Sequence, residues 1–141
     1  DVGFYPISIM FTLFNSKKVK LLKSNITKQN KVDTKGKIRA QNENQVIFDL
    51  SWGFKSSYKN SLIVYGTKGS LLVDFIFSKN INQDGKIIIN INRKSEIIKI
   101  PKSNQINLAF KDMLSNNNKL FYERYQTSYY ILNIIEKLKK R

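Results

Sequence analysis

Cysteine and histidine are both absent from this chain of 141 residues. Without cysteine the chain forms neither a disulfide nor a thiolate metal site. Without histidine it lacks the most common general base and the most common metal ligand. The sequence therefore excludes a Ser-His-Asp triad, or a zinc centre built on these ligands, within this chain alone.

Long apolar runs and nucleotide-binding loops are missing as well. No apolar run approaches the roughly 20 residues of a membrane-spanning helix, and the apolar start lacks the basic region and cleavage site of a signal peptide. We therefore expect a cytoplasmic protein. Neither GxGxxG nor GxxxxGK[ST] occurs, so no phosphate-binding loop is expected here. The acidic residues are scattered, and no pair stands out as an acid/base couple.

Arginine is scarce in a strongly basic chain. The net charge is +15, from 25 Lys+Arg against 10 Asp+Glu. Such a charge can indicate a nucleic acid or an anionic membrane surface as partner. Nearly all of the excess is lysine, whereas the planar fork of arginine suits phosphate better. Lysine, asparagine and isoleucine also share A/T-rich codons, so genome bias explains the excess equally well. A basic nucleic-acid binder stays a third, less favoured reading.

The two ends of the chain have helical patterns. Residues 6–14 begin with Pro6, which suits a first helical turn, and continue apolar on nearly every side, as in a buried helix. Residues 105–114 follow a capping residue, Ser103 or Asn104, and place one apolar face along Ile106, Phe110, Met113 and Leu114. A last helix from about Leu120 carries a stripe of Tyr122, Tyr125, Tyr129, Leu132 and Ile135.

Between the helices the sequence predicts about six to eight strands. Residues 45–54 alternate well and place Val46, Phe48, Leu50 and Trp52 on one face. Residues 61–77 indicate a hairpin with Gly66 and Gly69 supplying backbone freedom at its turn, and residues 86–100 indicate another. Such short connections allow only antiparallel pairing. We therefore expect an α+β fold, an open, mostly antiparallel sheet with helices on one face, in a single domain over residues 1–141.

Aromatic side chains within these elements have two readings. Trp52 and the tyrosines could stack on nucleic-acid bases, but core packing is the favoured interpretation. Asp1 and Tyr5 precede the first helix. They are either a simple helix start, with Asp1 as cap, or a proton-transfer pair whose phenol a neighbouring lysine would activate. Composition alone leaves both readings open.

Several segments together resemble a known family. "DVGFYP" before an apolar helix looks like the start of the C-terminal domain of the glucose–fructose oxidoreductase / inositol dehydrogenase / MocA family of NAD(P)-dependent sugar dehydrogenases. "SWGFKSSYKNSLIVYGTKGSLLVDFIFS" is similar to its central strands. "NQINLAFKDML" and "ERYQTSYYILNIIEKL" look like its two closing helices. The resemblance covers nearly the whole chain in the family's order.

The resemblance implies a fold and a missing partner domain. The family's C-terminal domain, like that of dihydrodipicolinate reductase, has an open, mostly antiparallel sheet whose free face packs against another subunit. An N-terminal Rossmann domain holds NAD or NADP and supplies a lysine from an E-K-P motif. This chain has neither the glycine fingerprint nor E-K-P. It therefore resembles a C-terminal piece that alone would bind no nicotinamide and be inactive.

The resemblance also implies two site residues. The family places an aspartate and a histidine beside the reacting carbon, in D-x-x-x-H. Asp1 matches the aspartate, while Tyr5 stands where the histidine would be, as in the branch that contains nucleotide-sugar 3-ketoreductases. The implied substrate is a sugar, most readily a nucleotide-linked one. Tyr5 would relay the proton and Asp1 would orient the sugar or tune the site.

Two further expectations concern partners. The resemblance implies a homo-oligomer formed through the sheet face. The same face also supports a second hypothesis, that the chain is a self-associating scaffold with no chemistry. No metal site, no membrane partner and no cofactor-binding residue within this chain are expected.

Overall fold

A computed structural model describes residues 2–30, 32–54, 57–115 and 118–139. These residues form seven strands and three helices. The chain divides into two compact units, one of residues 1–56 and 118–141 and one of residues 57–117. The single domain of the sequence analysis stays a prediction, and each unit is described by itself.

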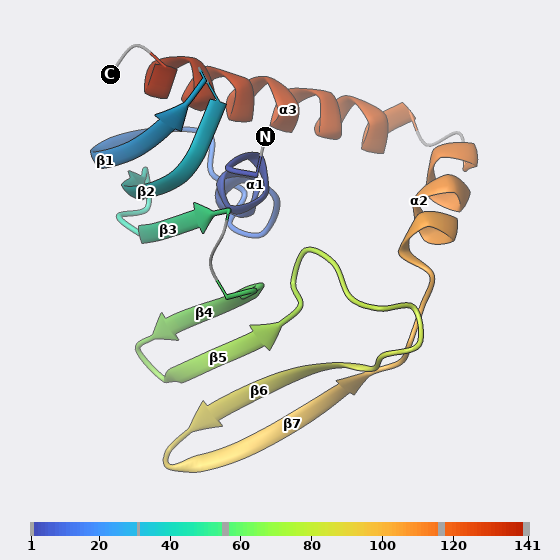
Figure 1. The fold of residues 1–141 in the computed structure, drawn as a ribbon. Coiled ribbons are helices and arrows are strands. Elements are labelled where there is room, and N and C mark those ends of the chain that lie inside the picture. The colour runs from blue at the N-terminus through green and yellow to red at the C-terminus, as the bar shows by residue number, and fades with distance from the viewer. Residues whose placement is uncertain (1, 31, 55–56, 116–117, 140–141) are drawn as a thin grey trace. The chain divides into compact units, whose positions relative to one another are not determined.

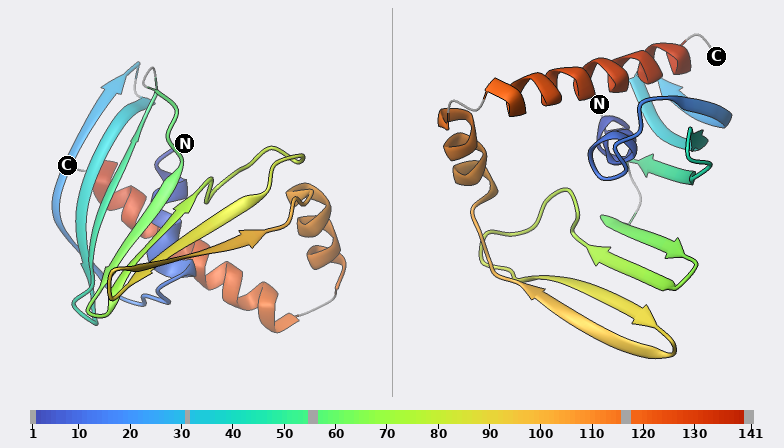
Figure 2. Two further views of the ribbon diagram at one scale, coloured as in Figure 1. Left: turned by 90° about the horizontal axis from the view of Figure 1, so that it is seen from below. Right: turned by 180° about the vertical axis from the view of Figure 1, so that it is seen from behind.

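The first unit is a three-stranded sheet with two helices. The sheet has the order β1 (Val19–Gln29), β2 (Val32–Asn42) and β3 (Ile47–Gly53), and both pairs are antiparallel. The helices α1 (Phe4–Thr12) and α3 (Asn118–Lys139) lie on one face of this sheet (Figures 1 and 2). Helices on one face agree with the predicted layout.

The core of the first unit lies between the helices and this sheet. From α1 it takes Ile7, Met10 and Phe11, and from α3 it takes Ile131, Ile134 and Leu138. The strands contribute Ile38, Ala40, Phe48 and Trp52. Strand alternation explains the last set, because residues two apart point to the same face. The predicted face of β3 is confirmed, since Val46 and Leu50 pack against this core as well.

The second unit is a four-stranded antiparallel sheet followed by a helix. Its order is β4 (Ser61–Gly66), β5 (Gly69–Asp74), β6 (Gly85–Ile91) and β7 (Lys94–Ile100), and α2 spans Gln105–Leu114. Successive strands pair with each other, as Figure 2 shows. Both predicted hairpins and the predicted cap are confirmed. Asn104 is the residue that caps α2, accepting from the Asn107 amide over 3.1 Å.

The seven antiparallel strands and three helices of the described residues confirm the predicted α+β class. Hydrogen bonds join the strands into two sheets, one of three strands and one of four.

Two backbone details differ from the prediction. Gly66 and Gly69 do not adopt a positive φ, and Gly69 is required because the carbonyl of Asn90 approaches it too closely for a Cβ. Positive φ occurs at non-glycine residues instead, among them Asn92 and Arg93, with φ of 51° and 63°, in the turn between β6 and β7.

The predicted burial of the tyrosines is wrong for most of them. Trp52 is buried as predicted, but five tyrosines besides Tyr5 are exposed: Tyr58 in the loop before β4, Tyr65 on β4, and Tyr122, Tyr125 and Tyr129 on α3. The buried face of α3 is instead that of Ile131, Ile134 and Leu138, with Ile135 at its edge. Contact with α1 sets this face. The predicted apolar face of α2 forms on the helix, but Ile106, Phe110, Met113 and Leu114 are all exposed.

Candidate functional site

The start of α1 carries the predicted proton-transfer residue. Pro6 lies in the first turn of α1, and Gly3 is the N-cap, with helical φ and ψ and no side-chain cap. Tyr5 has 51% of its surface exposed, and its ring meets that of Phe4 edge to face at a centroid distance of 6.2 Å. The Ser8 hydroxyl donates to the Tyr5 carbonyl over 2.7 Å. The phenol is therefore held on an ordered helix and is open to a ligand.

Asp1, the other predicted site residue, lies outside the described residues. The structure therefore does not test whether Asp1 and Tyr5 come together. The pairing of Asp1 with Tyr5 stays a prediction.

Beneath the start of α1 lies the only tryptophan of the sequence, Trp52. It stands opposite Gly36 in the β2–β3 register. A Cβ on Gly36 would overlap the Trp52 ring, and one on Gly3 would come within 2.8 Å of it. The indole thus separates the sheet from the beginning of α1, with glycine required on both sides.

Asp33, near the start of β2, holds the edge of this indole. The Trp52 Nε1–H donates to the Asp33 Oδ2 over 2.8 Å. Burial by itself would raise the pKa of the Asp33 carboxyl, but hydrogen bonds, that of Trp52 first among them, hold this pKa below its usual value. Asp33 is therefore a carboxylate near neutral pH, and it faces the interior rather than the outer side of the sheet.

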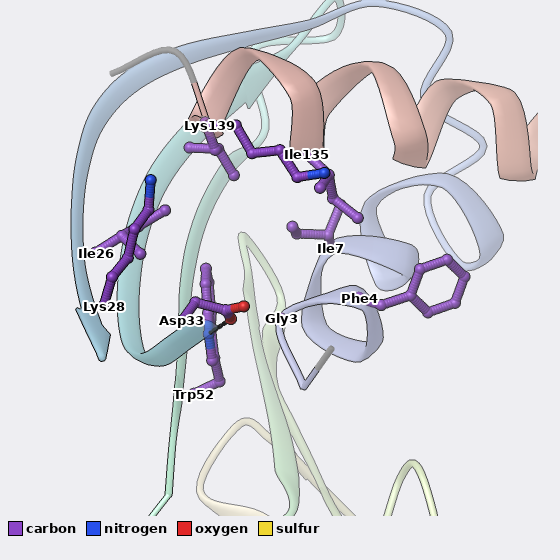
Figure 3. Close-up of a pocket in the computed structure, with 10 residues that line it drawn as sticks. Gly3, Phe4, Ile7, Ile26, Lys28, Asp33, Trp52, Ile135 and Lys139 are labelled. Atoms are coloured by element: carbon purple, nitrogen blue, oxygen red, sulfur yellow. Dashed lines mark hydrogen bonds between the residues drawn. The ribbon is translucent and has the colours of Figure 1, made fainter. Parts of the chain in front are cut away.

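A hollow of about 150 Å³ opens beside this pair. Figure 3 shows Lys28, Asp33 and Trp52 on the sheet side, Ile7 on the α1 side, and Ile135 and Lys139 from α3. Phe4 also borders the hollow, but its ring points away from it in this view. Tyr5 is not among the residues that line it. The hollow and the tyrosine are thus separate features of the same helix start.

Sequence reasoning did not bring Lys28, Asp33 and Lys139 together. They lie on β1, β2 and α3, so only the folded packing makes them neighbours. One signal was present in the sequence, namely Gly36 within a strand. A glycine in a strand often marks close approach by another group, and here that group is Trp52.

The described residues show neither a metal-binding cluster nor a membrane-spanning helix. Within the described ranges, no group of three or more acidic side chains lies close enough to hold a metal ion. The described helices include none that is both long and apolar enough to cross a bilayer.

No family model and no curated protein matches the chain. Solved structures do match in fold. One is a tyrosine-to-phenylalanine variant of KijD10, a 3-ketoreductase from Actinomadura kijaniata, in complex with TDP-benzene and NADP. The TM-score is 0.78 at 17% identity, over 96% of this chain and 44% of that one.

Two other matches extend the comparison. A lysine-to-alanine variant of KijD10, with the same two ligands, has a TM-score of 0.77 at 18% identity, over 93% of this chain and 44% of that one. A putative oxidoreductase from Erwinia carotovora atroseptica has a TM-score of 0.52 at 10% identity, over 68% of this chain and 32% of that one. The chain thus spans less than half the length of these proteins, and at such identities the likeness shows a shared fold.

Proposed function

We propose that this chain is the substrate-binding and assembly domain of an NAD(P)-dependent oxidoreductase that acts on a sugar, most readily a nucleotide-linked sugar. The observation that carries the proposal is the fold likeness to KijD10, a 3-ketoreductase crystallised with NADP and TDP-benzene, over 96% of this chain. The likeness agrees with the family resemblance of the sequence.

The nicotinamide cofactor belongs, in this proposal, to a second domain. The chain has no glycine-rich phosphate-binding loop, and the hollow beside Trp52, with about 150 Å³, is too small for a dinucleotide. The residues of this hollow therefore do not fit NAD or NADP. A Rossmann domain outside this chain would hold the cofactor and supply a lysine.

Tyr5 is the proposed proton relay. Its phenol is exposed on the first turn of α1, where a substrate held between two domains could reach it. A phenol with a reference pKa near 10 transfers a proton efficiently only when a cation stabilises the phenolate. The lysine of the second domain would be that cation. Tyr5 would then give its proton to a sugar carbonyl oxygen, or take one from the hydroxyl in the reverse direction, while Asp1 orients the sugar.

The test of the proposed function is an assay of the complete enzyme in which this chain would be one domain. With a TDP-linked 3-keto sugar, absorbance at 340 nm reports oxidation of NADPH or NADH. The proposal predicts turnover that depends on the nucleotide-linked sugar. Absence of turnover with every nucleotide-linked keto sugar, in a folded protein that binds the nicotinamide, would contradict the substrate class.

Assembly is the second part of the proposal. On one face of the four-stranded sheet, Ile63, Leu72, Ile88 and Ile97 stand directly opposite one another across β4 to β7. The next row on that face is polar, with Asn90 bonded to Ser70 at 3.4 Å and to Ser95 at 2.6 Å. Ile63 and Ile97 are largely exposed. An apolar row beside a polar row resembles the core and rim of a protein–protein interface. The proposed partner is the same sheet face of a second copy of this chain.

Light scattering tests this assembly directly. The proposal predicts a dimer or larger species whose association constant falls at least about tenfold when Ile97 is replaced by aspartate, because a charge would be buried in the interface. The control is Ile47→Asp on β3, at an isoleucine of the other sheet that is 47% exposed, against 60% for Ile97. A strictly monomeric wild-type chain, or equal weakening by both variants, would argue against the sheet face as the interface.

A further inference from the structure

The hollow beside Trp52 has an apolar interior. Ile7 and Leu138 are almost completely buried, and Ile26 and Ile135 are half-buried. These side chains come from α1, β1 and α3 and line the hollow together with the Trp52 edge. These apolar side chains pack against the core and leave an open space at the hollow. Such a lining favours a ligand whose main part is apolar. An apolar cavity of about 150 Å³ holds a ligand of the size of a benzene ring.

Charged groups from three elements border the same space. Lys28 lies on β1, Lys139 on the last turn of α3, and Asp33 on β2. Within the described residues neither ammonium group has an ion-pair partner, since the ion pair found there joins Arg39 and Asp49. Among the side chains that line the hollow, two ammonium groups and one carboxylate give a net charge of +1. The polar border is therefore complementary to a ligand with one negative charge.

The first turn of α1 adds to this preference. Gly3 and Phe4 border the hollow, and the positive end of the α1 dipole lies at these residues. The C-terminal turn of α3 has the opposite dipole, but Lys139 lies on that turn and offsets it. The balance of fixed charges around the hollow thus still favours an anion.

We propose that this hollow is a binding site for a small organic acid, a compact ring or branched chain with one carboxylate group. The ring would occupy the space between Ile7, Ile135 and Trp52, and the anionic group would lie at the mouth between Lys28 and Lys139. The site is independent of the proposed oxidoreductase function, because Tyr5 does not line it. Its ligand is a monoanion rather than a nucleotide, which would be too large.

Trp52 gives this site a specific reporter. As the only tryptophan, it contributes a single indole N–H signal to a ¹H–¹⁵N spectrum, and that N–H donates to Asp33 at the wall of the hollow. Titration of the 141-residue chain with cyclohexanecarboxylate should shift this signal saturably, with a Kd on the order of 1 mM for a ligand of this size. The neutral cyclohexanecarboxamide, which has nearly the same shape, should bind at least about threefold more weakly.

Matched variants separate the site from general charge attraction. Lys28→Met and Lys139→Met keep an apolar stem and remove one ammonium group each, and either should weaken cyclohexanecarboxylate about three- to tenfold. Lys37→Met removes the same charge from the opposite face of β2 and should leave the affinity unchanged. No saturable shift, equal affinity for the amide, or equal weakening by Lys37→Met would each overturn the proposal. None of these outcomes bears on Tyr5 or on turnover.

Discussion

The indole of Trp52 and the carboxylate of Asp33 form a cross-strand pair at 2.8 Å that supports the beginning of α1. The ring of Trp52 fills the space between the backbones of Gly3 and Gly36. Gly3 lies two residues before Tyr5. The position of Tyr5, the proposed proton relay, relative to the sheet therefore depends on the Trp52 ring. The pair therefore links the core of the first unit to its candidate site.

A double-mutant cycle measures this pair. Trp52→Phe removes the indole donor and Asp33→Ala removes the acceptor, and we expect a coupling free energy of about 1 kcal/mol in urea unfolding. In Trp52→Phe the pKa of Asp33 should also rise, because a hydrogen bond that lowers it is lost. Strictly additive effects together with an unchanged Asp33 pKa would show that the bond does not form in solution.

Replacement of Gly36 by alanine tests the close approach of the indole. The added Cβ would overlap the Trp52 ring, and we expect a loss of about 1 to 3 kcal/mol in the free energy of unfolding. Gly66→Ala is the matched control, because its Cβ would meet nothing nearer than 3.7 Å and the backbone there has no positive φ. Equal stability of the two variants would contradict the position of Trp52.

The carboxylate of Glu43 makes the free energy of unfolding depend on pH. Its carboxylate accepts from the amides of Lys17 at 2.8 Å and Lys18 at 3.2 Å, and the Lys17 bond is the first cause that lowers the pKa of Glu43. A group whose pKa is lower in the folded state stabilises the fold above its unfolded pKa, near 4.3. That contribution is lost as the pH falls through the folded value.

The free energies of unfolding of the wild type and of Glu43→Gln should therefore differ most above about pH 5. They should converge toward about pH 3. Chemical denaturation at a series of pH values gives this difference. Glu96→Gln is the control, because Glu96 accepts no such pair of amide bonds in the described residues. A difference between wild type and Glu43→Gln that stays constant over this range would contradict the assigned bonds.

The buried face of α3 allows a comparison of adjacent residues. Ile131 is 2% exposed and Leu132 is 55% exposed. Ile131→Ala should lower the free energy of unfolding by about 2 to 4 kcal/mol, because it leaves a cavity against α1. Leu132→Ala should change it by less than about 0.5 kcal/mol. A larger loss for Leu132→Ala than for Ile131→Ala would support the buried face that the sequence predicted, which includes Leu132.

That face shows which features the sequence could predict. Local signals performed well: Pro6 marked the start of α1, Asn104 capped α2, and alternation placed Phe48 and Trp52 on one face of β3. These features depend on neighbours within a few residues. The stripe of tyrosines along α3 had helical spacing too, yet spacing alone does not say which of two apolar faces meets the core.

Longer-range features lay beyond the sequence patterns. The strands were predicted individually, but their division between two sheets is set by pairings that the patterns do not encode. The Asp33–Trp52 bond joins residues 19 apart, and the hollow collects residues from α1, three strands and α3. Tyr5 was named by the resemblance from one segment; the structure leaves it exposed on α1, and its role stays a prediction.

The most direct test of the central proposal is the turnover of Tyr5→Phe in the complete enzyme with a nucleotide-linked keto sugar. If Tyr5 relays the proton, kcat should fall about 10² to 10⁴-fold, with little change in KM because the ring is kept. Tyr129→Phe, at a tyrosine of similar exposure, should retain normal turnover. A Tyr5→Phe enzyme with near-wild-type kcat would contradict the proposed role of Tyr5.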